Sequence, residues 1–155
     1  MPINATLVAR TCWSKTPRMS STSRTQIVAG RVVFVDDDGD TCDLYAEAFR
    51  VDGFIVDLAS DAVGAFRQID AAHPDVIVSD LSLPGIDGLE FCRSLKTNSK
   101  TTAIPVVLMS GYSGADWEML AIEAGAERLL TKPLLPEALL EVVRDVLASK
   151  GVRSG

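Results

Sequence analysis

Short apolar runs alternate with longer amphipathic stretches five times after residue 30. The short runs are typical of buried strands, whereas the longer stretches carry apolar residues every three or four positions, as helices do. Regular alternation of strand and helix predicts an α/β fold with a doubly wound, five-stranded parallel sheet. Right-handed crossovers place helices on both faces of such a sheet. We expect strands at 31–36, 54–58, 75–79, 104–109 and 126–130.

Capping and terminating residues bound the five predicted helices. The first helix is expected from Asp40 to Gly53, the second after a Ser60 cap, the third at 88–97, the fourth from a capping box at Ser113 and Asp116 to Gly125, and the fifth with Pro136 in its first turn. The residues expected to face the core are Leu44, Tyr45, Ala48 and Phe49 in the first helix, Val63, Phe66 and Ile69 in the second, Leu89, Cys92 and Leu95 in the third, and Leu139, Leu140, Val143 and Leu147 in the fifth.

Polar side chains stand at the carboxyl ends of four predicted strands. The first strand runs into Asp36 and Asp37, the third into Asp80, the fourth into Ser110 and the fifth into Lys132. In an open parallel sheet these ends lie along one edge, where such folds bind ligands. We therefore expect three carboxylates, a hydroxyl and an ammonium group to meet in one pocket.

Electrostatics indicate what this pocket holds. Two carboxylates about 4 Å apart repel each other by roughly 4 kcal/mol at an effective dielectric constant near 20. The three aspartates therefore need either a cation or a raised pKa. A site of oxygen ligands suits Mg²⁺, which keeps several waters and binds phosphate oxygens. Since Lys132 adds a positive charge and Ser110 a donor, the pocket is suited to placing a phosphoryl group on a carboxylate.

These motifs resemble those of the receiver domain of two-component response regulators, in particular the chemotaxis-regulator-like members that consist of a single domain. The matching residues are the Asp36–Asp37 pair, Asp80, Ser110 and the Lys132–Pro133 pair, in the family's order and usual spacing. The segment from Ser79 to Gly88 resembles the family's phosphoacceptor loop, with a proline four and a glycine eight residues after the aspartate. The resemblance covers about residues 30–150 and implies the flavodoxin-like strand order 2-1-3-4-5.

The resemblance implies a role for each acidic residue. Asp80 would be the phosphoacceptor, whose carboxylate forms an acyl phosphate. Asp37 and Asp80 would bind Mg²⁺ directly, Asp36 would bind it through water, and the backbone carbonyl of Ser82 would complete the protein ligands. Without the other motifs, Asp80 would read as a turn-capping aspartate and the Asp36–Asp37 pair as part of a solvated acidic loop.

Lys132 would neutralise charge on the transferred phosphoryl group, and Ser110 would donate to it and couple phosphorylation to the surface. The family also implies a cis peptide bond before Pro133, which proline tolerates. One position departs from the family, since Leu129 stands where many members carry a switching Tyr or Phe. Signalling is therefore expected to use Ser110 and the neighbouring loops. Tyr112 either shields the acyl phosphate or is an exposed loop aromatic.

Composition favours one soluble domain. The chain has 155 residues, of which 47% are hydrophobic, and no apolar run approaches the roughly 20 residues of a membrane span. The net charge is −6, but residues 1–29 carry four basic residues and no acidic one, so the remainder carries −10. An acidic body argues against binding to a nucleic-acid backbone. We expect a disordered extension at 1–29, a receiver domain at 30–150 and a tail at 151–155.

The three cysteines are an odd number without metal-ligand spacing, so we expect Cys42 and Cys92 to be small buried hydrophobes and the protein to reside in a reducing cytoplasm. His73 is the only histidine and lies in a predicted loop. Because the chain also lacks a nucleotide-binding loop, its phosphoryl donor would be a histidine kinase, a phosphotransfer protein or a small phosphodonor.

The resulting hypothesis is a phosphorylation-controlled switch, not an enzyme, that acts on a downstream protein or relays phosphate, with no nucleic acid or membrane as partner. We expect no output domain after the receiver domain. One alternative is a scaffold with the receiver fold but no phosphorylation. Another is a phosphohydrolase with an aspartyl-phosphate intermediate, although Ser82 stands where such hydrolases carry a second acid.

Overall fold

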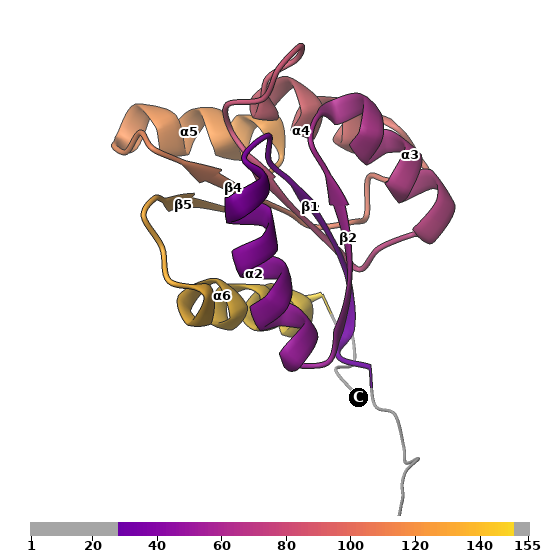
Figure 1. Ribbon diagram of the computed structural model, residues 1–155. Helices are drawn as coiled ribbons and strands as arrows, with labels where there is room; N and C mark the ends of the chain where they lie inside the picture. Colours follow the sequence, from indigo (N-terminus) through magenta and orange to yellow (C-terminus); the bar gives the residue numbers. More distant parts are fainter. Residues whose placement is uncertain (1–27, 151–155) are drawn as a thin grey trace, which may run out of the picture.

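The computed structural model describes residues 28–150, which form one parallel sheet and five helices (Figure 1). The strand order is β2-β1-β3-β4-β5, which confirms the predicted doubly wound fold. The predictions for residues 1–27 and 151–155 lie outside the described residues. The strands are β1 (Gly30–Val35), β2 (Phe54–Ala59), β3 (Val76–Asp80), β4 (Val106–Ser110) and β5 (Arg128–Thr131). The helices are α2 (Gly39–Val51), α3 (Ala62–Ala72), α4 (Gly88–Thr97), α5 (Ala115–Ala124) and α6 (Pro136–Ser149).

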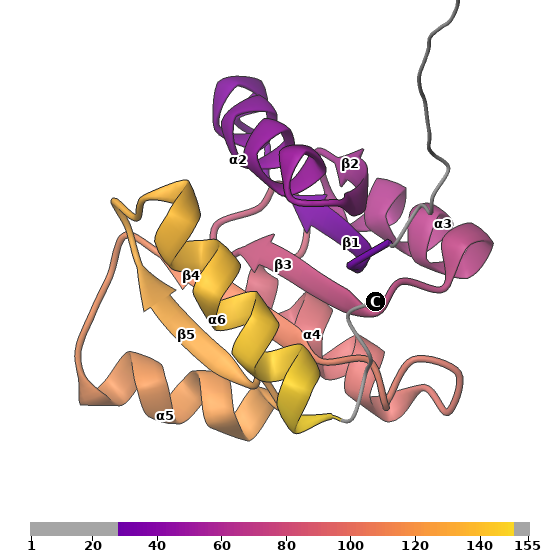
Figure 2. The ribbon, with the colours of Figure 1, turned by 90° about the horizontal axis from the view of Figure 1, so that it is seen from below.

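The helices are divided between the two faces of the sheet (Figure 2). Helices α2 and α6 cover one face, and α3, α4 and α5 cover the other. Because successive side chains of a strand point to opposite faces, Val32 and Phe34 enter the first core, whereas Val33 and Val35 enter the second. The central strands are thus buried on both sides, which explains their continuous apolar runs. None of the helices within residues 28–150 has the length and apolar composition that a bilayer span requires.

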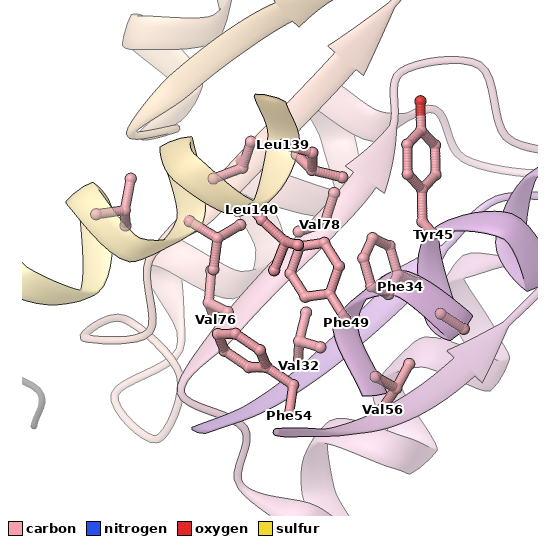
Figure 3. Close-up of a cluster of buried hydrophobic side chains, with 14 of the residues drawn as sticks. Val32, Phe34, Tyr45, Phe49, Phe54, Val56, Val76, Val78, Leu139 and Leu140 are labelled. Atoms are coloured by element: carbon pink, nitrogen blue, oxygen red, sulfur yellow. The ribbon is translucent and has the colours of Figure 1, made fainter. Parts of the chain in front are cut away.

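Aromatic residues dominate the core between α2, α6 and the sheet (Figure 3). Phe49 of α2 contacts Phe34 of β1 edge-on at 4.9 Å between ring centroids and Phe54 of β2 at 5.1 Å. Tyr45, one helical turn earlier, stacks on Phe34 at 6.1 Å with the two rings 8° from parallel. These contacts fix α2 against β1, and therefore also the acidic loop that joins them.

Three helix caps differ from the sequence predictions. In α2, Asp38 is the N-cap and accepts a hydrogen bond from the backbone N–H of Asp40, so the Asp40 cap was wrong. In α3, Asp61 takes the place predicted for Ser60. The capping box at Ser113 was also wrong, because α5 follows a glycine and has no side-chain cap. The first two shifts are small, since neighbouring Asp and Ser residues are all good caps.

The core-facing residues were predicted well for α4 and α6 but not for α3. All the named positions of α4 and α6 are buried, as are Cys42 and Cys92. Leu44 and Val63 were wrong, because they keep 59% and 60% of their surface exposed. Phe66 keeps 37% exposed, but its ring does point inward and contacts the buried Phe91 at 5.1 Å between ring centroids. Helix α3 buries the small residues Ala62 and Ala65, together with Ile69, which was predicted to face the core.

Gly88 begins α4 in close contact with the backbone that follows Asp80. Its N–H donates to the carbonyl of Leu81 at 2.7 Å. A Cβ atom at Gly88 would lie 2.5 Å from the carbonyl oxygen of Asp80 and 2.8 Å from Cα of Leu81. Only glycine therefore lets α4 approach the end of β3 this closely.

Gly88→Ala is expected to lower the free energy of unfolding by about 1–3 kcal/mol, because the added methyl group forces backbone to move. Urea unfolding measures this change. Gly39→Ala is the matched control, since a Cβ atom there meets nothing within 4 Å. Alanine is also the better helix former, so the control should be neutral or slightly stabilising. Equal stability of Gly88→Ala and the parent would contradict the close approach.

Candidate functional site

Three carboxylates meet at the carboxyl edge of the sheet. Asp36 and Asp37 directly follow β1, and Asp80 is the last residue of β3. Because β1 and β3 are paired neighbours, their ends lie side by side. One carboxylate oxygen from each aspartate lies within 4.8 Å of the others. The sequence prediction that these residues would converge is therefore correct.

Lys132 lies between two of these carboxylates. It follows β5, and its backbone N–H donates to the carbonyl of Ser110 at 2.7 Å. Its Nζ donates to Oδ2 of Asp36 at 3.1 Å and lies 3.4 Å from Oδ1 of Asp80. The ammonium group thus bridges the ends of β1 and β3. The Lys132–Pro133 peptide bond is cis, as the resemblance implied.

Burial and charge act in opposite directions on these groups. Burial raises the pKa of Asp80, Lys132 opposes this, and the negative charge of Asp36 adds to it, so the net pKa lies above its ordinary value. Burial by itself lowers the pKa of Lys132, but the hydrogen bond and charge of Asp36, together with Asp80, outweigh it and raise the net pKa. Lys132 is therefore held as a cation, and a second cation beside Asp80 would favour its ionised, nucleophilic form.

The acidic cluster has the donor set and access that Mg²⁺ requires. All three side chains offer oxygen, and Asp37 is exposed. The side chains of Asp36 and Asp80 keep only 11% and 12% of their surface exposed. Since Mg²⁺ retains several waters, a few carboxylates at the rim of an open site fit it better than a closed cage would. Ser82, two residues after Asp80, is exposed, and the role of its carbonyl stays a prediction.

Ser110 ends β4, the strand that pairs with β3, and its hydroxyl contacts the loop before α5. It is the last residue of β4 and is 1% exposed. Its Oγ accepts a hydrogen bond from the backbone N–H of Tyr112 at 2.8 Å. The ring of Tyr112 is 55% exposed and stacks on Trp117 of α5 at 5.0 Å, with the rings 14° from parallel. Tyr112 is therefore exposed in this structure, and a role in shielding the acyl phosphate stays a prediction.

One contact beside the site was not foreseen from the sequence. Tyr45 was predicted only as a core residue, but its hydroxyl donates to the carbonyl of Leu134 at 2.6 Å. The available signal was a tyrosine in a buried helix stripe, because a buried phenol hydroxyl usually has a hydrogen-bond partner.

Known proteins combine the same doubly wound fold with an acidic pocket and a lysine beside it. The family model "Response regulator receiver domain" matches residues 32–144. The chain belongs to this family. Receiver domains typically act as phosphorylation switches, interact with histidine kinases and are generally not true enzymes. The acidic cluster of Asp36, Asp37 and Asp80 is consistent with the Mg²⁺ site of receiver domains.

Individual relatives support the same assignment. The chain is 32% identical over 127 residues to the transcriptional regulatory protein PrrA of Mycobacterium leprae, covering 82% of this chain and 54% of that protein. It is similar in structure to the chemotaxis response regulator CheY4 of Vibrio cholerae, with a TM-score of 0.74 and 27% identity over 77% of this chain and 100% of CheY4. A putative response regulator from Chloroflexus aurantiacus gives a TM-score of 0.73 and 29% identity, over 77% of this chain and 98% of that one. The chain spans about half the length of the curated relatives it matches.

Proposed function

We propose that this protein is a phosphorylation-controlled signalling switch whose phosphoacceptor is Asp80. The observation that carries the proposal is the Lys132 ammonium, 3.4 Å from Oδ1 of Asp80 and beside the acidic cluster. An isolated strand-end aspartate needs no such partner. A carboxylate that takes up a phosphoryl group does, because negative charge accumulates on the transferred oxygens.

In the proposed reaction, a carboxylate oxygen of Asp80 attacks phosphorus, an acyl phosphate forms, and the bond from phosphorus to the donor breaks. The donor is a phosphohistidine of a histidine kinase or phosphotransfer protein, and its imidazole leaves. Lys132 and Ser110 hold oxygens of the phosphoryl group. Asp37, Asp80 and the Ser82 carbonyl would hold Mg²⁺ directly, and Asp36 would hold it through water. When bound, Mg²⁺ supplies further neutralisation of the phosphoryl charge.

We propose that residues 30–150 form a receiver domain that acts in the cytoplasm on a downstream protein. We assign it neither a nucleic-acid nor a membrane partner, because the sequence after residue 29 carries a charge of −10. The burial of Cys42 and Cys92 as thiols is compatible with a reducing compartment.

Phosphotransfer from purified histidine kinases of the host, followed by intact-mass spectrometry, tests the proposal. One phosphoryl group per chain is expected from the cognate kinase when Mg²⁺ is present, and none when it is chelated. No uptake from any kinase, or from acetyl phosphate, would favour a scaffold. Sustained release of many phosphates per chain would favour a phosphohydrolase.

Phosphorylation is proposed to reach the surface through Ser110. Its hydroxyl is bonded to Tyr112, which stacks on Trp117, so a new partner for that hydroxyl would disturb both aromatic residues. The affected surface is formed by α5, β5 and α6. An aromatic switch in β5 is not available, since Leu129 has neither a ring nor a hydroxyl.

Beryllofluoride, which stands in for the phosphoryl group on Asp80, is expected to shift the amide resonances from Ser110 to Trp117 more than that of Leu129. Ser110→Ala should still take up phosphate but show smaller shifts at Trp117, because the linking hydroxyl is gone. Ser113→Ala, an exposed serine of the same loop, is the control and should respond like the parent. A parent-like response of Ser110→Ala would exclude coupling through this hydroxyl.

A further inference from the structure

Tyr45 combines a buried ring with a directed hydroxyl. The residue is 6% exposed and its ring stacks on Phe34. In Figure 3 the hydroxyl points away from the apolar cluster, and it donates to the Leu134 carbonyl at 2.6 Å. Burial raises the pKa of Tyr45, so its hydroxyl stays protonated and remains a donor. A phenylalanine at this position could fill the same core space, so packing alone does not account for the hydroxyl.

The carbonyl that Tyr45 binds belongs to the loop that carries Lys132. Leu134 lies two residues after Lys132, and Pro133 between them has no N–H to donate. The loop is held on one side by the Lys132 N–H bound to the Ser110 carbonyl, and on the other by the Leu134 carbonyl bound to Tyr45. These two hydrogen bonds enclose Lys132 and fix where its side chain leaves the backbone.

The same helix also holds the acidic loop. Asp38, which precedes α2, caps its N-terminus, and the Asp38 N–H donates to Oδ1 of Asp36 at 2.9 Å. Helix α2 therefore fixes Asp36 through its first turn and the lysine loop through Tyr45, about two turns further along. Asp36 and Lys132, which are 3.1 Å apart, are therefore both positioned by the same helix.

We propose that Tyr45 is a positioning residue that holds Lys132 in register with Asp36 and Asp80. This inference rests on the proposed phosphotransfer function. Tyr45 touches neither the phosphoryl group nor the metal. It acts through the backbone of Leu134, so its loss lets the lysine loop move relative to α2, and the ammonium then spends less time beside Asp80.

Tyr45→Phe removes only the hydroxyl and tests this proposal. With acetyl phosphate and Mg²⁺, its phosphorylation rate is expected to fall roughly threefold to tenfold, the factor that one neutral hydrogen bond is worth. The Lys132→Met variant should be phosphorylated more slowly, so its reaction is followed for longer. Adding Tyr45→Phe to this variant should not lower the phosphorylation rate further. Val146→Ala, a truncation in the same buried cluster, is the control for lost stability and should keep the parent rate.

Two outcomes would overturn the positioning role: a Tyr45→Phe rate equal to that of the parent, or the same loss with and without Lys132. The Lys132 side-chain methylene resonances give a second measurement that needs no phosphorylation, and Tyr45→Phe should shift them while Val146→Ala should not. If the parent itself takes up no phosphate, the proposed function fails, and these resonances alone decide the role of Tyr45. Unshifted resonances would then refute it.

Discussion

Asp80→Asn is expected to take up no phosphoryl group from acetyl phosphate and Mg²⁺, under conditions in which the parent takes up one. The amide is nearly the same shape as the carboxylate but is a far weaker nucleophile, so the fold should persist while the chemistry stops. Lys132 keeps its other partner, because Asp36 remains at 3.1 Å. Intact-mass spectrometry measures the uptake, and the parent adduct should be stable in acid and labile in alkali, as an acyl phosphate is.

Asp116→Asn is the matched control, since Asp116 is an exposed aspartate in the first turn of α5. It undergoes the same change of charge and shape but should be phosphorylated like the parent. Mapping of the phosphoryl group to a serine or to His73 would refute Asp80 as the acceptor. Uptake by Asp80→Asn equal to that of the parent would do the same.

Asp37→Ala is expected to abolish Mg²⁺ binding. At a Mg²⁺ concentration one hundred times the dissociation constant, the parent should gain about 2.7 kcal/mol in its free energy of unfolding. The variant should gain none of this, because Asp37 is one of the two carboxylates proposed to bind the metal directly. Without Mg²⁺ the variant should be at least as stable as the parent, since one of three mutually repelling carboxylates has been removed. Urea unfolding with and without Mg²⁺ measures both effects.

Asp40→Ala controls for the loss of one negative charge near this loop. Asp40 is exposed and lies outside the acidic cluster, so its variant should keep the Mg²⁺ affinity of the parent. Titration followed by fluorescence or by thermal stability compares the two variants. The metal-site assignment does not survive if Asp37→Ala binds Mg²⁺ as tightly as Asp40→Ala.

The architecture and the convergence of the site were predictable because both follow from periodicity. A strand buried on both sides must be apolar throughout, as in Val32–Val35, and parallel strands must end at the same edge. Asp36 and Asp80 could therefore be brought together from their positions alone. Helix starts were less predictable, because the run from Asp36 to Asp40 offers several carboxylates that can cap a helix.

Contacts between distant segments could not be predicted in the same way. The hydrogen bond from Tyr45 to Leu134 spans 89 residues and depends on how α2 and α6 pack together. The close approach of Gly88 to Asp80 likewise depends on where α4 meets the sheet. Periodicity also overestimated burial at Val63, because the inner face of α3 is filled partly by the smaller residues Ala62 and Ala65.

The pairing of β1 with β3 has a consequence for how the chain folds. Val32 pairs with Val76, 44 residues later, and parallel neighbours cannot be joined by a tight hairpin. The chain between β1 and β3 must therefore lose conformational entropy before the contacts between these two strands can form. A chain still emerging from the ribosome has no Lys132 to place beside Asp36 until nearly the whole sheet has been synthesised. Reactivity toward phosphodonors is therefore expected to appear only once the whole sheet has formed.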